Sequence, residues 1–110
     1  MNISKFIVSY KYIDQKLIDK KILWGLNYLK RIWSKFKIKL SLNKSIINTQ
    51  ENIIFLFNNE NNLKKNFDIK VKLSKKNESF AIIPHDNKIL IYANDSRGFI
   101  YSITELADII

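Results

Sequence analysis

Apolar side chains recur along this chain with two different periods, and each period predicts a type of element. Residues 14–35 repeat apolar positions every three to four residues, which is typical of a helix with one buried face. Residues 96–110 have the same spacing and predict a second helix. The apolar stripes consist of Ile18, Ile22, Leu26, Leu29 and Trp33 in the first helix and Phe99, Ile103, Leu106 and Ile110 in the second.

Two residues of the first predicted helix carry further expectations. Asp14 precedes the apolar stripe and is expected to cap the helix, because its carboxylate can accept hydrogen bonds from the first free backbone amides. Gly25 lies in mid-helix, where glycine lowers helix propensity. Its presence there indicates a close approach of the helix to a sheet.

Alternation and short apolar runs predict six strands. Residues 36–42 and 67–73 alternate apolar with polar side chains, which is typical of strands with one buried face. Residues 53–57 are continuously apolar and predict a central strand. The remaining strands are predicted at residues 3–10, 80–83 and 88–93, with a hairpin connection at 84–87 and loops at 43–52 and 58–66.

The predicted element order is β-α-β-β-β-β-β-α, and the fold class is α+β. The simplest packing is a two-layer α/β sandwich: a mostly antiparallel sheet of five to six strands, with both helices on one face. The other face then points to solvent or to a partner. The length of 110 residues corresponds to one domain, residues 1–110.

Composition excludes several classes of protein. The chain has no cysteine, so it has neither disulfides nor thiolate metal sites. No apolar run reaches the roughly 18 residues that span a membrane. No signal peptide is visible, which leaves a cytoplasmic protein or a secreted protein without its leader.

The chain is basic, with 19 lysines and arginines against 10 acidic residues. Only Arg31 and Arg97 are arginines, although arginine is the preferred residue for bidentate phosphate and base contacts. Lysine, isoleucine and asparagine are all encoded by A/T-rich codons, so genome composition contributes to the charge. These features argue against a nucleic-acid partner.

The residues with chemical potential favour structural roles. His85 is the only histidine and lies in the predicted turn, where an exposed surface role is expected and a metal site lacks further ligands. Trp24 and Trp33 could stack on a sugar, but their helical spacing favours core packing. We therefore predict no catalytic residue, no metal site and no cofactor in this chain.

Lysines gather at the outward positions of two predicted strands. The four side chains would form a basic sheet face, which is either a solvated surface that prevents aggregation or a binding face. No aromatic side chain accompanies them, although single-stranded nucleic acids are usually stacked on aromatic rings. The four residues are Lys37, Lys39, Lys70 and Lys72.

The closing strand–turn–helix, residues 78–107, is the most informative stretch. A Glu-Ser-Phe-Ala-Ile-Ile strand at 78–83 leads through a hairpin to Lys-Ile-Leu-Ile-Tyr-Ala at 88–93. A turn then opens the last helix. The turn residues are Asp95, Ser96, Arg97 and Gly98, followed by Phe-Ile-Tyr-Ser at 99–102.

This stretch resembles the end of the non-catalytic N-terminal α/β domain, of domain 2 type, in glycoside hydrolases of the β-hexosaminidase and α-glucuronidase type. The strand at 3–10 and the helix that contains Tyr-Leu-Lys-Arg-Ile at 28–32 are similar to the family's first strand and helix. Ser102 departs from the family, which has glycine or alanine there. In physical terms the turn is a packing corner, in which Asp95 or Ser96 caps the helix and Gly98 permits a close approach to the sheet.

The resemblance implies an accessory domain at the N-terminal part of a longer glycoside hydrolase, followed by a catalytic barrel that carries the acidic residues. It implies that this chain alone is not an enzyme, whereas the parent protein is a glycosidase. The expected partner is the barrel, with carbohydrate contact as a further option. The alternative is a free-standing basic module that binds nucleic acid or an acidic partner.

Overall fold

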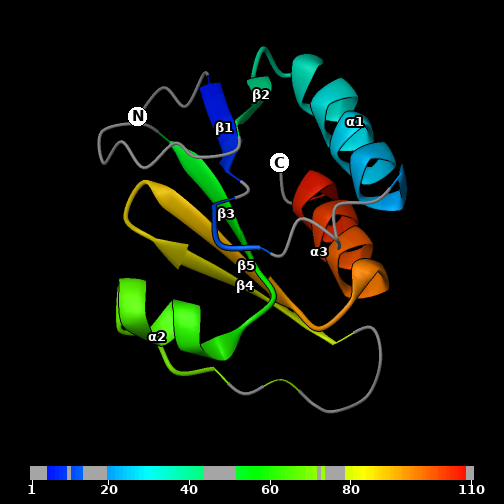
Figure 1. Cartoon of the computed structure of the whole chain (residues 1–110). Coiled ribbons are helices and arrows are strands. Elements are labelled where there is room, and N and C mark those ends of the chain that lie inside the picture. Colours follow the sequence, from blue (N-terminus) through cyan, green and yellow to red (C-terminus); the bar gives the residue numbers. More distant parts are fainter. Residues whose placement is uncertain are drawn as a thin grey trace.

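The computed structural model describes residues 5–9, 11–13, 20–43, 52–71, 73 and 79–108 (Figure 1). Within these residues, five strands form one sheet, and three helices cover it. In chain order the elements are β1 (Lys5–Ser9), α1 (Lys20–Ser34), β2 (Lys39–Asn43), β3 (Ile53–Phe57), α2 (Glu60–Phe67), β4 (Phe80–His85), β5 (Lys88–Ala93) and α3 (Ser96–Asp108).

The sheet is mixed and mostly parallel, with the strand order β2-β1-β3-β5-β4. β1 pairs in parallel with β2 and β3, and β3 pairs in parallel with β5. Only β4 runs antiparallel, through its hairpin with β5. The expectation of a mostly antiparallel sheet is therefore wrong. A strand–helix–strand unit such as β1-α1-β2 brings the chain back to the same end of the sheet, so its strands run parallel.

The sheet is covered on both faces, which contradicts the expected two-layer sandwich. α1 and α3 lie side by side on one face, here called the helix-pair face, and α2 lies on the other, the α2 face (Figure 1). Every residue of β3 is buried, because alternate side chains enter cores on opposite sides. A continuous apolar run is the usual pattern of such a strand.

The turn that follows α1 replaces the start of the strand expected at 36–42. The Ile38 amide donates to the Trp33 carbonyl at 3.0 Å and the Lys37 amide donates to Ser34 at 3.1 Å. Lys37 has a φ of 62°. These bonds form a Schellman-type helix end. Phe36 is 54% exposed instead of inward, whereas Ile38 and Leu40 are buried as expected.

α2 occupies the stretch that was expected to be a loop. Asn59 caps it by accepting from the Asn61 amide at 2.7 Å, and Asp68 ends it with a left-handed φ of 55°. Leu63 and Phe67, one turn apart, both contact the α2-face core. The Asn59 cap and the Leu63–Phe67 pair are the sequence features that indicate a helix here. The surrounding asparagines and lysines are more typical of a loop.

No strand forms in the described part of the stretch expected to be a strand at 67–73. Phe67 ends α2, and the following residues have no strand pairing. Their alternation still has a structural meaning, because Ile69, Val71 and Leu73 pack against the α2-face core. An extended segment that lies over a sheet buries alternate side chains in the same way as a paired strand, so the pattern alone does not distinguish the two.

The other strands and both predicted helices lie where they were expected. Pro84 and His85 belong to β4, so the turn is shorter than predicted and centres on Asp86, whose φ is 56°. Proline is tolerated there because β4 is an edge strand. The Asp14 cap, Ile18 and Ile110 lie outside the described residues.

Candidate functional site

The corner between β5 and α3 is the motif that the sequence singled out. Asp95 caps α3, because its carboxylate oxygen accepts from the Gly98 amide at 2.8 Å. Its backbone carbonyl accepts from the Phe99 amide at 3.2 Å. Ser96 and Arg97 occupy the first turn, and the Arg97 side chain is exposed.

Gly98, in the first turn of α3, lies against Ser79 and against Ala93, the last residue of β5. A Cβ atom at this position would lie 2.8 Å from the Ser79 carbonyl oxygen and 3.1 Å from the Ala93 Cβ. Both distances are tighter than ordinary contacts, and the first involves backbone, which cannot rotate away. Ser102 is buried and donates to the Phe99 carbonyl at 2.7 Å, so its hydroxyl group is satisfied within the helix. The geometry of this corner is that of close packing.

Gly25, in contrast, does not face the sheet. A Cβ atom there would meet Ile103 and Ile100 of α3 at 3.8 to 3.9 Å, which is ordinary van der Waals contact. The expectation of a close approach to a sheet is wrong at this position. Gly25 lies at the contact between the two helices, where an alanine side chain would fit.

His85 is half-buried in β4 and does not lie in an exposed turn. Its ring packs edge-on against Phe67, with 5.4 Å between the ring centroids. Phe67 in turn belongs to an aromatic cluster with Tyr12, Phe55 and Phe57. His85 thus closes one side of the α2-face core.

The two tryptophans have different environments. Trp33 is 1% exposed and packs on Phe6 at 5.1 Å, as expected for a core residue. Trp24 is 59% exposed, which contradicts the expected core role. It stacks on Tyr28 at 5.9 Å and 13°.

An exposed aromatic patch therefore lies on the outer side of the helix pair. The Arg31 guanidinium lies 6.0 Å from the centroid of the Tyr28 ring. Trp24 and Ile100 also line a shallow pocket of about 260 Å³ between α1 and α3. We call this patch the Trp24 surface; it consists of Trp24, Tyr28, Arg31 and Ile100. Tyr28 is partly buried, so Trp24 is the exposed ring of this patch. A large exposed aromatic ring near an arginine is typical of residues that anchor a partner.

The lysines expected to form one sheet face do not do so. Lys39 is on β2 and Lys37 is in the helix end before it, whereas Lys70 lies in the segment after α2. Lys72 lies outside the described residues. Within the described residues the predicted basic sheet face does not form, because no strand forms in the described part of 67–73.

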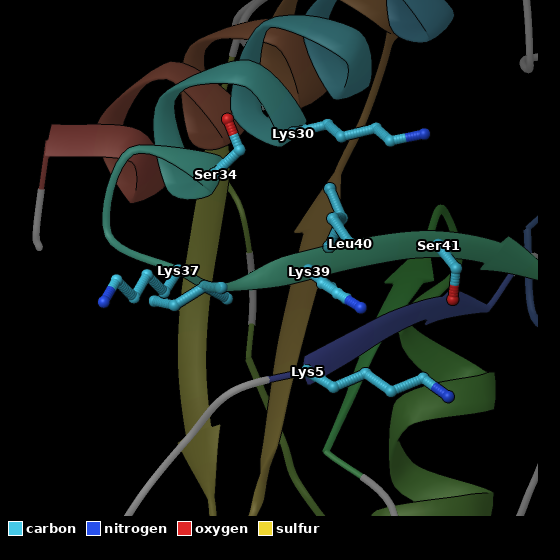
Figure 2. A pocket seen from close by; sticks show the side chains of 8 residues that line it. Lys5, Lys30, Ser34, Lys37, Lys39, Leu40 and Ser41 are labelled. Carbon is cyan, nitrogen blue, oxygen red and sulfur yellow. The ribbon is translucent and has the colours of Figure 1, made fainter.

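Four lysines line a groove of about 640 Å³ at the β2 end of the sheet, here called the lysine groove (Figure 2). Lys37 and Lys39 are joined there by Lys5 from β1 and Lys30 from α1. The parallel register places Lys5 directly beside Lys39. The sequence pattern did not predict Lys5 and Lys30 at this site, because only the strand pairing and the helix packing bring them to this place. The remaining lining residues are Ser34, Ile38, Leu40 and Ser41.

Two further findings concern only the described residues. No three histidine, aspartate or glutamate side chains among them are close enough together to hold a metal ion. None of the described helices is both long and apolar enough to cross a membrane.

Among solved structures, this chain is similar to part of a GH138 enzyme targeting pectin rhamnogalacturonan II, with a TM-score of 0.58 and 17% sequence identity. The similarity covers 94% of this chain but 13% of that enzyme's chain. No protein-family model matches the sequence, and no curated protein matches it. At this identity the similarity concerns the fold: a small α/β domain that also occurs within a much longer glycoside hydrolase.

Proposed function

We propose that this chain is a non-catalytic accessory domain of a larger glycosidase-like protein, in which it precedes a catalytic barrel. The observation that carries the proposal is the asymmetry of the structural match. Nearly the whole chain matches, yet it corresponds to about one eighth of a glycoside hydrolase. The sequence resemblance of the closing strand–turn–helix to the N-terminal domains of β-hexosaminidases and α-glucuronidases supports the same class.

The Trp24 surface is the proposed contact with the catalytic domain. Trp24 exposes more than half of its area, and its ring is held by the stack on Tyr28. An aromatic pair that is already ordered loses little side-chain entropy on binding. Burying it against a neighbouring domain would remove an exposed apolar patch from water.

The coding sequence and an activity assay test this role. A reading frame that continues beyond Ile110 into a barrel supports the proposal, and a stop codon with no barrel overturns it in this form. The 110-residue chain should show no turnover in a screen of aryl glycosides. Clear turnover by the chain alone would show that it is itself an enzyme.

The contact surface is tested in the full-length protein. Trp24→Lys should lower the thermal unfolding midpoint of the catalytic domain or its activity, because it places a charge in the interface. Phe36→Lys is the matched control, since Phe36 is also an aromatic side chain with 54% exposure but lies at the other end of α1. Equal effects of the two substitutions would contradict docking through the Trp24 surface.

A direct carbohydrate contact is a second role for the same surface. An exposed aromatic ring that is already held in place presents an apolar face on which a sugar ring can pack. Because Trp33 is buried, Trp24 is the tryptophan whose fluorescence should respond to a ligand at the surface. Titration with rhamnogalacturonan fragments should quench this fluorescence, and an unchanged spectrum at saturating sugar would exclude the contact.

A further inference from the structure

β2 is the last strand on one side of the described sheet, and its residues Lys39, Leu40 and Ser41 line the lysine groove. β1 pairs with one side of β2, and no described residue pairs with the other side. An edge strand presents unpaired backbone amide and carbonyl groups, which form a template for one more strand. The backbone amide and carbonyl groups on the outer edge of β2 can therefore bind a partner with defined direction, in addition to the lysine side chains of the groove.

The groove wraps around both sides of this edge. Figure 2 shows Lys30 and Ser34 projecting from α1 on one side of β2, and Lys39 and Lys5 on the opposite side. Ile38 and Leu40 lie on the α1 side and are buried. An added strand would thus lie beside α1 on one side and have the ammonium groups of Lys39 and Lys5 on the other.

The described lining of this groove is positively charged. It includes four lysines and no aspartate or glutamate. Four ammonium groups around one groove repel each other, and an anionic ligand would relieve this repulsion. The charge points to an acidic occupant.

Lys37 adds an independent observation. It occupies the left-handed position of a helix end, with a φ of 62°, where glycine is the favoured residue. A side chain there costs conformational energy that glycine would avoid. Lysine is therefore less favourable than glycine for the backbone at this position. Unlike glycine, it adds a positive charge to the groove.

We propose that the outer edge of β2, which no described residue pairs with, binds an extended acidic peptide segment of a partner protein, which adds as a further strand. Its backbone would pair with the outer edge of β2, as in other cases of β-strand addition. Its acidic side chains, at every second position, would face Lys39 and Lys5, and the side chains between them would lie on the α1 side of the sheet. This binding is separate from the accessory role, because it uses the opposite end of the sheet from β4 and not the Trp24 surface.

Other occupants fit the groove less well. A second copy of the chain paired edge to edge would bring like-charged lysines together, which is destabilising. A polysaccharide acid or a nucleic acid satisfies the lysines but has no backbone that pairs with a strand edge. An acidic peptide satisfies both the charges and the edge.

The probe is a short capped peptide that alternates valine with glutamate, carrying a fluorescent label. Fluorescence anisotropy with the 110-residue chain should give saturable binding that weakens with added salt. The same peptide with N-methylated valines keeps its charge but loses strand pairing, and it should bind at least about tenfold more weakly. Equal binding of the two peptides would overturn the proposal, because charge alone would then explain the interaction.

Charge reversals locate the site. Lys30→Glu with Lys39→Glu should weaken peptide binding by about tenfold or more, from the loss of attraction and the new repulsion. Lys64→Glu with Lys65→Glu is the control with the same change of net charge, because both residues are exposed on α2. Equal losses in both double variants would show that only the overall charge matters and would contradict the proposal.

A third variant separates binding from folding. Lys37→Gly should weaken peptide binding severalfold while the thermal unfolding midpoint stays equal or rises, because glycine suits the backbone there. A lower midpoint would overturn the structural reading of Lys37. Polygalacturonate and single-stranded DNA serve as alternative ligands, and tighter binding of either one with the same dependence on Lys30 and Lys39 would replace the peptide.

Discussion

The two faces of the sheet are covered in different ways. The helix-pair face is covered by two helices, α1 and α3, which pack on the sheet and on each other. The α2 face is covered by one helix of eight residues and by the segment that follows it. Its core has a larger share of aromatic side chains, whereas that of the helix-pair face is mainly aliphatic. We infer that the helix pair carries the cooperative core, and that the α2 layer opens more easily.

The largest expected effect is on the helix-pair face. Phe99 is fully buried, and Phe99→Ala should destabilise the fold by about 3–5 kcal/mol through lost contacts and a cavity. Urea unfolding should show one cooperative transition at a lower midpoint. Tyr101→Ala, an exposed position on the same helix, should change the free energy of unfolding by no more than about 0.5 kcal/mol. Similar losses at both positions would contradict the assignment of the core.

Leu63→Ala tests the α2 layer. Leu63 is the buried residue of α2, and its truncation should cost about 2–4 kcal/mol. Hydrogen exchange should show faster exchange of α2 amides, while the α1 and α3 amides remain protected. Lys64→Ala, at an exposed neighbouring position, is the control. Uniform loss of protection across all three helices would remove the distinction between the faces.

The two glycines should respond in opposite directions. Gly98→Ala should destabilise by about 1–3 kcal/mol, because its Cβ atom would press on the Ser79 carbonyl and on Ala93. Gly25→Ala should stabilise by about 0.5–1 kcal/mol, because the contacts are ordinary and alanine favours the helix. Thermal and urea unfolding measure both. Destabilisation by Gly25→Ala would show that the helix pair is packed more tightly than the structure indicates.

The smallest expected effect is that of pH on stability, through two tyrosines of the α2-face core. Burial raises the pKa of Tyr12, and burial together with the charge of Glu60 raises the pKa of Tyr92. The folded state therefore favours the protonated phenols. Their contribution to stability is complete below the unfolded pKa of about 10 and is lost as pH rises through the raised folded pKa. Urea unfolding between neutral and alkaline pH should show this loss of stability, and Tyr12→Phe should make the loss smaller. The same dependence of the free energy of unfolding on pH in this variant would contradict the role of Tyr12.

Local patterns predicted most of the elements because their information is short-range. The stripes of α1 and α3 and the apolar runs of β3 and β5 identify these elements without a structure. The same reasoning failed for α2 and for the segment after it. Eight residues with only two apolar positions give a weak helical signal, and an alternating segment over a core resembles a strand.

The sequence by itself determined the two long helices, the central strands and the Asp95–Gly98 corner, because each depends on neighbours within a few residues. Only the tertiary structure decided the parallel pairing and the second covered face, because both depend on where the chain goes after each helix. The tertiary structure also determined the lysine groove and the Trp24 surface. Lys5, Lys30, Lys37 and Lys39 meet only through the β1–β2 register and the position of α1, and Trp24 is exposed because Gly25 and Leu26, not Trp24, face the core.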